Sequence, residues 1–297
     1  MKTCSPDSAS EMFYLAIVAF GKEDYSLALE YAERAATAAP RSLVFRHAVT
    51  YLRRILEEGK PGVYVTGEAF SRFIRAGSNL PLYERTSAAL RQVYQEYETL
   101  DLLDIGVGDG LALLPAVNEH IRTMTLLEPS TVMLNILCRE LDARHLSYQA
   151  VCSPLQEFVK TPVGQWHVIE STFCLHAIPP LERPDLFVWM REHGDRVVLA
   201  EFDVPGCADM YDPQWVHYIM ERYERGLAEY SHDGGIVAQG FLLPVLFGNF
   251  DRTTARTTYE QPIQTWKRAL EQAGFHSVTI KPLFPYWWAT AYVLDAT

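Results

Sequence analysis

One stretch near the middle of the chain constrains the fold more than any other. Residues 102–110 read Leu-Leu-Asp-Ile-Gly-Val-Gly-Asp-Gly, and four apolar residues follow. Glycines at alternate positions permit a tight turn in which bare backbone approaches a ligand, and a helix starting there adds free N–H groups. The pattern predicts a strand, a glycine turn and a helix. Because Gly110 is followed by Leu111, the spacing is not the G-x-G-x-x-G of a dinucleotide fingerprint.

A second acid lies at the end of the next apolar run. Glu128 follows residues 124–127. In a doubly wound sheet, an acid at this place lies beside the first glycine turn and can hold a ribose diol. A tight turn in another nucleotide-binding α/β fold, or a plain strand-to-helix connection, could contain the same glycines. The turn and the acid are therefore interpreted together.

Together these residues resemble the class I S-adenosylmethionine-dependent methyltransferases, which pair an acid-x-Gly-x-Gly-x-Gly turn with an acid ending the second strand. The resemblance implies a Rossmann-like sheet and S-adenosylmethionine as cofactor. It places three glycines against the methionine part of the cofactor: Gly106, Gly108 and Gly110. It also places Asp104 near the amino group and Glu128 on the ribose. Further cofactor contacts are expected at Tyr83, Pro129, Cys152, Ser153, Glu170 and Ser171.

Regular alternation of short apolar runs and helical patterns follows the glycine turn. The expected strands are 102–105, 123–127, 147–151, 166–169 and 196–201, and the expected helices are 111–120, 130–141, 154–159 and 182–193. Strands separated by helices predict a parallel, doubly wound sheet. Two closing strands, over 276–281 and 287–294, complete the predicted α/β fold. That fold is a Rossmann-like, mostly parallel seven-stranded sheet.

Two segments lie outside this minimal fold. Residues 1–75 predict an N-terminal helical cap with helices over 11–20, 25–39 and 42–58, so that residues 76–297 form the methyltransferase domain. After strand five, an insertion at about 205–260 contains an aromatic-rich helix over 212–230. Aromatic walls with a few polar groups are typical of a substrate lid, although an aromatic stripe on a helix is equally typical of a core.

Several residues are candidates for the chemistry. Methyl transfer from a sulfonium is an in-line displacement, and a base is needed only when the acceptor must lose a proton. We expect His176, Glu201 and Asp203 to orient the acceptor or take its proton, because they follow strands four and five. The substrate-binding candidates are Arg72, Phe173, His217, Tyr218 and Tyr223.

The composition of the chain indicates which kinds of partner the protein can bind. The formal net charge of -11, with 37 acids against 26 bases, argues against nucleic acid as the main partner, since phosphate binding relies on surplus lysine and arginine. No apolar run approaches the ~20 residues that a membrane span needs. Five scattered cysteines indicate reduced thiols in a cytoplasmic protein and no structural metal site. A homodimer through aromatic residues of the last strands is a further expectation.

The sequence leaves more than one function open. We expect methyl transfer to an oxygen or nitrogen of a small-molecule metabolite, and peptide or protein methylation stays an alternative. The order of segments also resembles the GRAS-domain proteins. The matching parts are the helical start, the glycine turn, the acidic end of strand five, the helix over 215–230 and the tail around 266–275. This second resemblance implies a non-catalytic ligand-binding or protein-interaction module.

Overall fold

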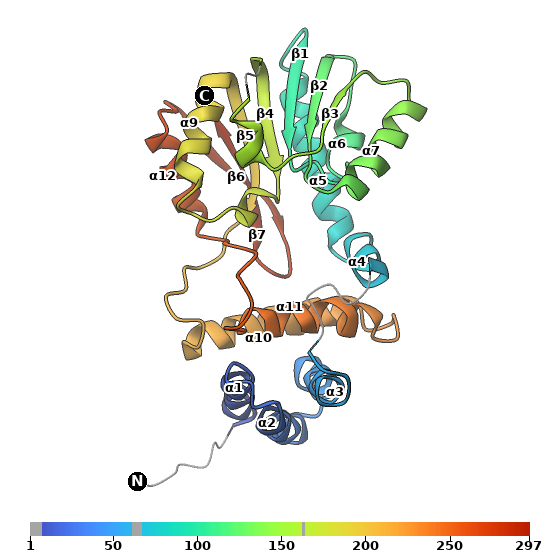
Figure 1. Cartoon of the computed structure of the whole chain (residues 1–297), viewed down its shortest axis with the longest axis vertical. Helices are drawn as coiled ribbons and strands as arrows, with labels where there is room; N and C mark the ends of the chain where they lie inside the picture. The colour runs from blue at the N-terminus through green and yellow to red at the C-terminus, as the bar shows by residue number, and fades with distance from the viewer. Residues whose placement is uncertain (1–7, 61–66, 162–163) are drawn as a thin grey trace. The chain divides into compact units, whose positions relative to one another are not determined.

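The computed structural model describes residues 8–60, 67–161 and 164–297 (Figure 1). Contacts divide the chain into two compact units. A helical unit comprises 1–80 and 207–256, and a sheet unit comprises 81–206 and 257–297. Most of the insertion after strand five therefore shares a compact unit with the N-terminal helices, a different division from the expected boundary after residue 75.

In the described part of the sheet unit, seven strands form one sheet in the order β3-β2-β1-β4-β5-β7-β6. The strands are β1 (Leu100–Ile105), β2 (Ile121–Leu127), β3 (Gln149–Val151), β4 (Trp166–Thr172), β5 (Gly194–Phe202), β6 (Val278–Pro285) and β7 (Thr290–Ala296). Only β7 runs against the others, antiparallel to both β5 and β6. The predicted α/β, mostly parallel seven-stranded sheet is confirmed.

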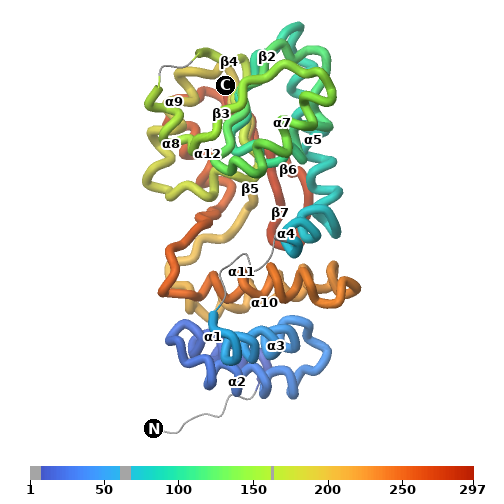
Figure 2. Tube along the Cα trace, turned by 45° about the vertical axis from the view of Figure 1, so that its right-hand side comes forward, coloured from blue at the N-terminus to red at the C-terminus, as the bar shows by residue number. Residues whose placement is uncertain are grey.

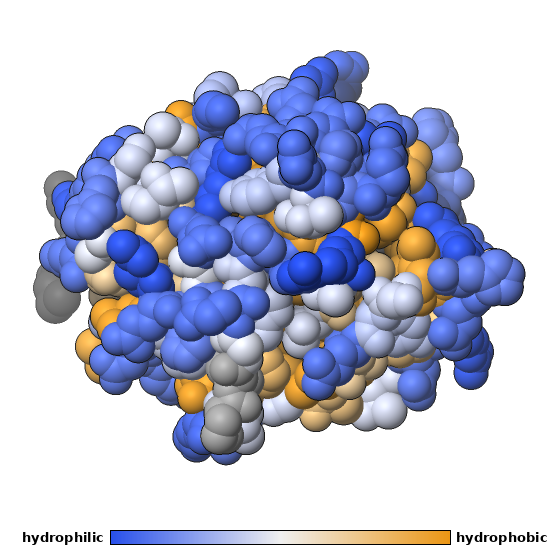
Figure 3. Space-filling view, turned by 90° about the horizontal axis from the view of Figure 1, so that it is seen from above, coloured by the Kyte–Doolittle hydropathy of each residue, from blue (hydrophilic) through white to orange (hydrophobic). Residues whose placement is uncertain are grey.

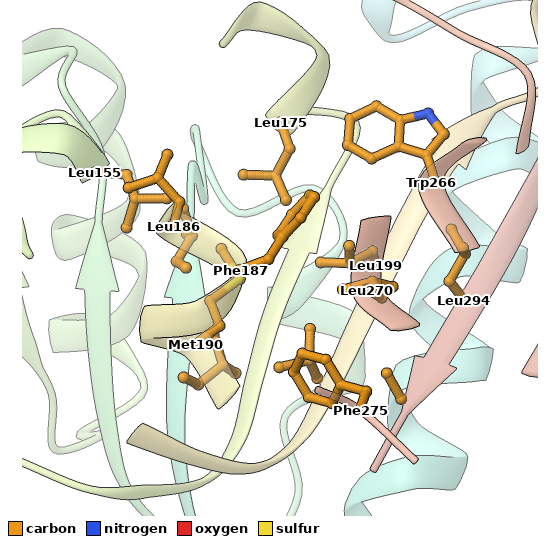
Figure 4. Close-up of a cluster of buried hydrophobic side chains, with 14 of the residues drawn as sticks. Leu155, Leu175, Leu186, Phe187, Met190, Leu199, Trp266, Leu270, Phe275 and Leu294 are labelled. Carbon is orange, nitrogen blue, oxygen red and sulfur yellow. The ribbon is translucent and has the colours of Figure 1, made fainter. Parts of the chain in front are cut away.

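Helices cover both faces of this sheet (Figures 1 and 2). Successive strand residues point to opposite faces, and each face has its own core. Leu102 and Val168 pack with α5 (Asn79–Tyr94) and α7 (Thr131–Ala143). The other core contains Leu103 and Ile169 and is partly shown in Figure 4. Its helices are α8 (Leu155–Phe158), α9 (Arg183–His193) and α12 (Ile263–Gln272).

The helix expected over 111–120 is much shorter than predicted. Only α6 (Leu113–Ala116) is helical, and Val117 leaves the helix with φ -49 and ψ 132. Pro115 lies within this turn and has no N–H to donate. Beyond it, the Asn118 side chain accepts a hydrogen bond from the His120 N–H at 3.1 Å. Such a local side-chain acceptor competes with helix continuation.

The helical unit contains α1 (Ala9–Phe20), α2 (Tyr25–Ala38), α3 (Leu43–Glu58), α4 (Gly67–Ile74), α10 (Pro213–Glu229), η2 (Ala238–Leu242) and α11 (Leu243–Gly248). Side-chain oxygens of Ser8, Asp24 and Ser42 cap the first three helices. Phe247 of the insertion packs on Phe20, with ring centroids 4.7 Å apart. The insertion therefore supplies part of the core of the N-terminal helices.

One carboxylate also ties the insertion to the N-terminal helices. Glu224 on α10 accepts hydrogen bonds from the Leu43 and Val44 N–H groups, at 2.8 and 2.9 Å. Its Oε2 also accepts from Ser42 Oγ at 2.9 Å. An anion at a helix N-terminus satisfies free N–H groups and complements the helix dipole.

Hydrophilic residues dominate the face seen in Figure 3, with apolar residues showing in smaller groups between them. Among the helices of residues 8–60, 67–161 and 164–297, none combines the length and apolar character needed to cross a bilayer.

Candidate functional site

The three glycines after β1 have different roles. All lie at positive φ: +72 for Gly106, +59 for Gly108 and +82 for Gly110. A Cβ on Gly106 would lie 2.0 Å from the Cys174 Sγ, and one on Gly110 would lie 2.5 Å from the Leu137 Cδ1, whereas Gly108 has nothing within 4 Å. Packing within the protein therefore requires glycine at the outer positions. Of the three, only Gly108 offers bare backbone to open space.

Glu128 is fixed beside this open backbone. It follows β2, whose Leu127 pairs with Ile105 of β1, and its side chain is 8% exposed. Its Oε2 accepts from the Gly108 N–H at 3.0 Å and its Oε1 from the Ser130 N–H at 2.8 Å. Each oxygen keeps capacity for a second donor. The carboxylate is thus held in place with acceptor sites left over, as a diol ligand would need.

Two acids lie side by side at the ends of β1 and β4. Asp104 and Glu170 are register partners, are 1% and 0% exposed, and each shifts the pKa of the other. The Tyr94 hydroxyl lies 2.6 and 2.7 Å from the two Glu170 oxygens. Among the described residues, Asp104 Oδ1 is buried without a hydrogen-bond partner. Glu170 is therefore occupied by protein groups, while one Asp104 oxygen is available.

Burial governs the protonation of this pair. It raises the pKa of Asp104 to about 7, with the Glu128 charge adding to the rise and the Glu170 hydrogen bond opposing it. Burial, followed by the Asp104 charge, raises the pKa of Glu170 well above its ordinary value. Like charges at close range cannot both ionise cheaply. The pair accordingly carries a proton near neutral pH, on Glu170.

The remaining predicted cofactor residues have varied surroundings. Ser171 is buried, and its Oγ donates to the Ile105 carbonyl at 2.8 Å, which links β4 to β1. After β3, Cys152 is exposed and Ser153 is partly exposed, and Cys152 Sγ lies 3.2 Å from Thr131 Oγ1. The Pro129 carbonyl accepts from Cys152 Sγ at 3.6 Å.

Aromatic rings gather after β4 and β5. Phe173 has a φ of +52, a conformation that costs a non-glycine residue roughly 1–2 kcal/mol. Its ring stacks on Phe202 at 4.7 Å and meets Tyr83 edge-on at 6.0 Å. Phe202 stacks in turn on Tyr286 at 5.4 Å. Phe202 and Tyr286 were not predicted as site residues, because neither lies in a recognisable motif.

His176 and Glu201 form a buried pair. His176 lies in the short turn η1 (Leu175–Ala177) after β4, and its Nδ1 is 2.8 Å from Glu201 Oε2 at the end of β5. The two side chains are 15% and 1% exposed. Burial lowers the pKa of His176, but the Glu201 carboxylate more than offsets this effect, and the net pKa is raised. The pair uses Nδ1, which leaves Nε2 as the ring atom able to take a proton.

Arg183 fixes the backbone around His176. Its Nε donates to the Ile178 carbonyl at 2.9 Å and its Nη2 to the Tyr259 carbonyl at 2.7 Å. The Tyr259 N–H donates to the His176 carbonyl at 2.7 Å, and the Arg183 guanidinium lies 4.4 Å from the Trp266 ring. Sequence reasoning missed Arg183, because its position at the start of a helix gives no functional signal.

Asp203 has a structural partner. Its Oδ1 accepts a hydrogen bond at 2.8 Å from the N–H of Ile263, the first residue of α12. Its backbone N–H donates to the Thr290 carbonyl at 2.9 Å. A carboxylate at this place caps the helix. The described contacts thus give Asp203 a capping role and do not join it to His176.

The other substrate candidates lie in the helical unit. Exposed Arg72 pairs with Glu68 at 2.8 Å. His217 is 58% exposed, with Nε2 3.3 Å from Glu221. Tyr218 stacks on Trp215 at 5.4 Å. Tyr223 is 3% exposed and belongs to the buried core, and its role in substrate binding stays a prediction.

An open cavity of about 400 Å³ lies within the helical unit. Its lining comprises Ser10, Ser42, Val44, Phe45, His217, Met220, Glu221, Glu224 and Arg225. In residues 8–60, 67–161 and 164–297, no group of three or more histidine, cysteine or acidic side chains is arranged to hold a metal ion.

No protein-family model matches the sequence, and no curated protein matches it. Among solved structures, magnesium protoporphyrin IX methyltransferase from Synechocystis PCC 6803, with bound S-adenosylhomocysteine, matches with a TM-score of 0.50 and 13% identity, over 77% of this chain and 92% of that one. The fold is that of the S-adenosylmethionine-dependent methyltransferases. At such low identity the likeness shows the fold alone.

Two further likenesses are weaker. A putative O-methyltransferase from Nostoc punctiforme matches with a TM-score of 0.49 and 15% identity, over 97% of this chain and 72% of that one. A methyltransferase from Aquifex aeolicus matches with a TM-score of 0.47 and 12% identity, over 77% and 96%. The resemblance to GRAS-domain proteins is not shown by these matches and stays a prediction.

Proposed function

We propose that this protein is an S-adenosylmethionine-dependent methyltransferase that acts on an oxygen or nitrogen of a small-molecule metabolite. The observation that carries the proposal is the open backbone at Gly108 with the Glu128 carboxylate bonded to it. The unpartnered Asp104 Oδ1 adds a buried acceptor on the same sheet edge. In support, the Synechocystis protein of the same fold was crystallised with S-adenosylhomocysteine, and its named substrate is a small molecule.

Each group in this arrangement suits one part of the cofactor. The Gly108 backbone would lie against the methionine part, the Asp104 carboxylate would bind the ammonium group, and the Glu128 oxygens would accept from the ribose hydroxyls. Exposed Cys152 and partly exposed Ser153 would border the adenine. When bound, S-adenosylmethionine supplies the methyl group as a sulfonium substituent.

The His176–Glu201 pair gives the chain a general base. Glu201 accepts the Nδ1 hydrogen bond, so Nε2 can take a proton from an acceptor hydroxyl or amine as that atom is methylated. The Glu201 charge then stabilises the imidazolium that forms, in agreement with the raised pKa of His176. Positioned general bases contribute roughly 10²–10⁴-fold to a rate.

Gly108→Val tests the cofactor site. A side chain at φ +59 fills the open space beside the turn, so the variant should lose S-adenosylhomocysteine binding by more than ~100-fold, a loss of about 3 kcal/mol. The measurement is the shift in melting temperature at saturating S-adenosylhomocysteine. Wild type should show a clear rise and Gly108→Val none.

Gly274→Val is the matched control. Gly274 also has a positive φ, +97, and open space around its Cβ position, but it lies at the end of α12. The Gly274→Val substitution imposes the same kind of backbone strain at a place away from the glycine turn. The rise in melting temperature on adding S-adenosylhomocysteine should therefore persist in this variant. No shift in the wild-type protein would contradict the proposal. With binding established, metabolite extracts incubated with the enzyme and S-adenosylmethionine can be searched for products heavier by one CH2.

A further inference from the structure

Asp104 and Glu170 are two acidic side chains buried next to each other, and the proposed cofactor site does not explain why both are there. The two carboxyl groups occupy partner positions on adjacent parallel strands, and both are at most 1% exposed. No lysine, arginine or histidine is among the groups that shift the pKa of either acid. Two buried carboxylates without a cation would repel each other strongly. One of them must hold a proton.

We propose that Glu170, kept neutral and oriented by Tyr94, is a positioning residue: it donates a hydrogen bond to Asp104 and so leaves Asp104 as the one ionisable acceptor for the ammonium group of the cofactor. This inference rests on the proposed function. It makes cofactor binding a proton-linked event. When Asp104 is protonated in the free protein, the bound ammonium group displaces that proton to solvent, and nothing else is exchanged.

The surroundings of Asp104 support this assignment. Glu128, directly after β2, adds negative charge. In the segment after β4, the partly exposed Cys174 thiol has its pKa raised to about 12, first by burial and then by Glu201, Glu128 and Asp104. Cys174 is thus neutral at physiological pH. From α5, Tyr94 is neutral as well, because burial and Glu170 raise its pKa well above the ordinary value. Glu128 and Glu170 are therefore the acids that decide the charge on Asp104.

Tyr94 gives Glu170 a direction. Its hydroxyl contacts both Glu170 oxygens from the helix side, and Asp104 lies on the neighbouring strand. A carboxyl held in this way keeps its geometry without competing for the ligand. Asp104 Oδ1 then remains the only oxygen of the pair that is buried and unpartnered in the described chain.

Isothermal titration of the full-length protein with S-adenosylhomocysteine tests the inference. Since Asp104 titrates at about 7, affinity should be about tenfold weaker at pH 6 than at pH 8. At pH 6, titrations in two buffers with different ionisation enthalpies should show release of nearly one proton per ligand, and at pH 8 a small fraction of one.

Variants at Glu170 separate positioning from simple packing. Glu170→Gln keeps a donor toward Asp104 and an acceptor for Tyr94, so the midpoint of the pH dependence should stay within about half a unit of wild type. Glu170→Met has similar bulk but no donor, so the midpoint should move upward by about one unit, with about fivefold weaker binding at pH 7. Tyr94→Phe should fall between the two. Tyr148→Phe, which removes a hydroxyl that donates to Asp142 on α7, should match wild type.

The outcomes are distinct. No binding of S-adenosylhomocysteine at any pH overturns the proposed function and this inference with it. Binding that is independent of pH between 6 and 8 overturns the inference alone. Equal midpoints for Glu170→Gln and Glu170→Met also overturn it, because a purely structural Glu170 would alter stability without moving the titration of Asp104. Melting temperatures of each variant without ligand show that these comparisons use folded protein.

Discussion

Glu170 and Glu201 are the same residue type at the ends of neighbouring strands, with 0% and 1% exposure, yet their neighbours differ. Glu170 alternates with Val168 and faces the core of α5 and α7, where its partner is another acid. Glu201 alternates with Leu199 and faces the core of α9 and α12, where its partner is His176. One sheet therefore contains a carboxyl pair on one face and a carboxyl–imidazole pair on the other.

Because both glutamates are buried, the difference between the two pairs comes from the neighbour of each. Beside Asp104, burial and like charge both act against ionisation, and Glu170 keeps its proton. Beside His176, the carboxylate reverses the effect of burial and raises the pKa of the imidazole. The first pair suits binding of a cation, and the second suits acceptance of a proton. Breaking each pair in turn should separate cofactor binding from proton transfer.

Replacing His176 should have the largest effect. His176→Gln removes the atom that takes the acceptor proton, so the single-turnover rate should fall by roughly 10²–10⁴-fold. S-adenosylhomocysteine affinity should stay within about twofold of wild type, since the change lies on the α9 face. The measurement is methyl transfer from S-adenosylmethionine to the acceptor identified by mass.

His193→Gln is the matched control for this change. His193 lies at the end of α9, where its Nδ1 is 2.8 Å from the Trp189 carbonyl, and no role in catalysis is proposed for it. Its rate should equal that of wild type. A His176→Gln rate within threefold of wild type would show that no base is used there.

Local patterns predicted the parts of the site that local chemistry determines. The glycine spacing implied a tight turn, and the structure has one, with positive φ at Gly106, Gly108 and Gly110. An acid after the second apolar run implied Glu128 beside the turn. Turn chemistry and strand order in a doubly wound sheet are encoded within a few residues. The length of α6 was not predicted, because the apolar pattern does not show that Pro115 and Asn118 end the helix.

Other parts depend on contacts distant in sequence. Tyr94 and Glu170 are separated by 76 residues, and their meeting depends on strand register and helix packing together. The insertion residue Tyr223 was expected in a substrate pocket, but it is buried in the helical unit. An aromatic stripe has the same pattern in both cases, so burial could not be predicted from spacing.

Asp104→Asn should give the next largest effect, with opposite signs for binding and stability. The pKa of an unfolded aspartate is near 3.8, and that of Asp104 in the folded protein is about 7. Between these two pH values the protein takes up a proton when it folds, so the free energy of unfolding falls as the pH rises from about 4 to 7. The amide avoids this cost. At pH 8.5 the free variant should be more stable than wild type, by up to about 4 kcal/mol, while its affinity for S-adenosylhomocysteine is lost.

Urea unfolding at pH 4.5 and pH 8.5 measures this effect, which should fall to about 1 kcal/mol at the lower pH. Asp101→Asn on the same strand is the control with opposite sign. A hydrogen bond from Arg122 lowers the pKa of Asp101, so its replacement should destabilise the protein at pH 8.5. Equal stability of Asp104→Asn and wild type at both pH values would mean that Asp104 ionises without cost.

Glu201→Gln should have the smallest effect, a shift in the titration of His176. The amide oxygen still accepts from Nδ1, but the charge that raises the pKa of His176 is gone, and burial, which lowers it, then prevails. The midpoint should therefore fall below that of wild type. The measurement is an NMR titration of labelled imidazoles, with the His176 signal assigned from its absence in His176→Gln.

Because Glu201 raises the pKa of its partner whereas the Glu170 hydrogen bond lowers the pKa of Asp104, removing Glu201 and removing the Glu170 donor should move the two midpoints in opposite directions. Movement in the same direction would mean that the two faces of the sheet do not differ in the way their carboxyl groups are used.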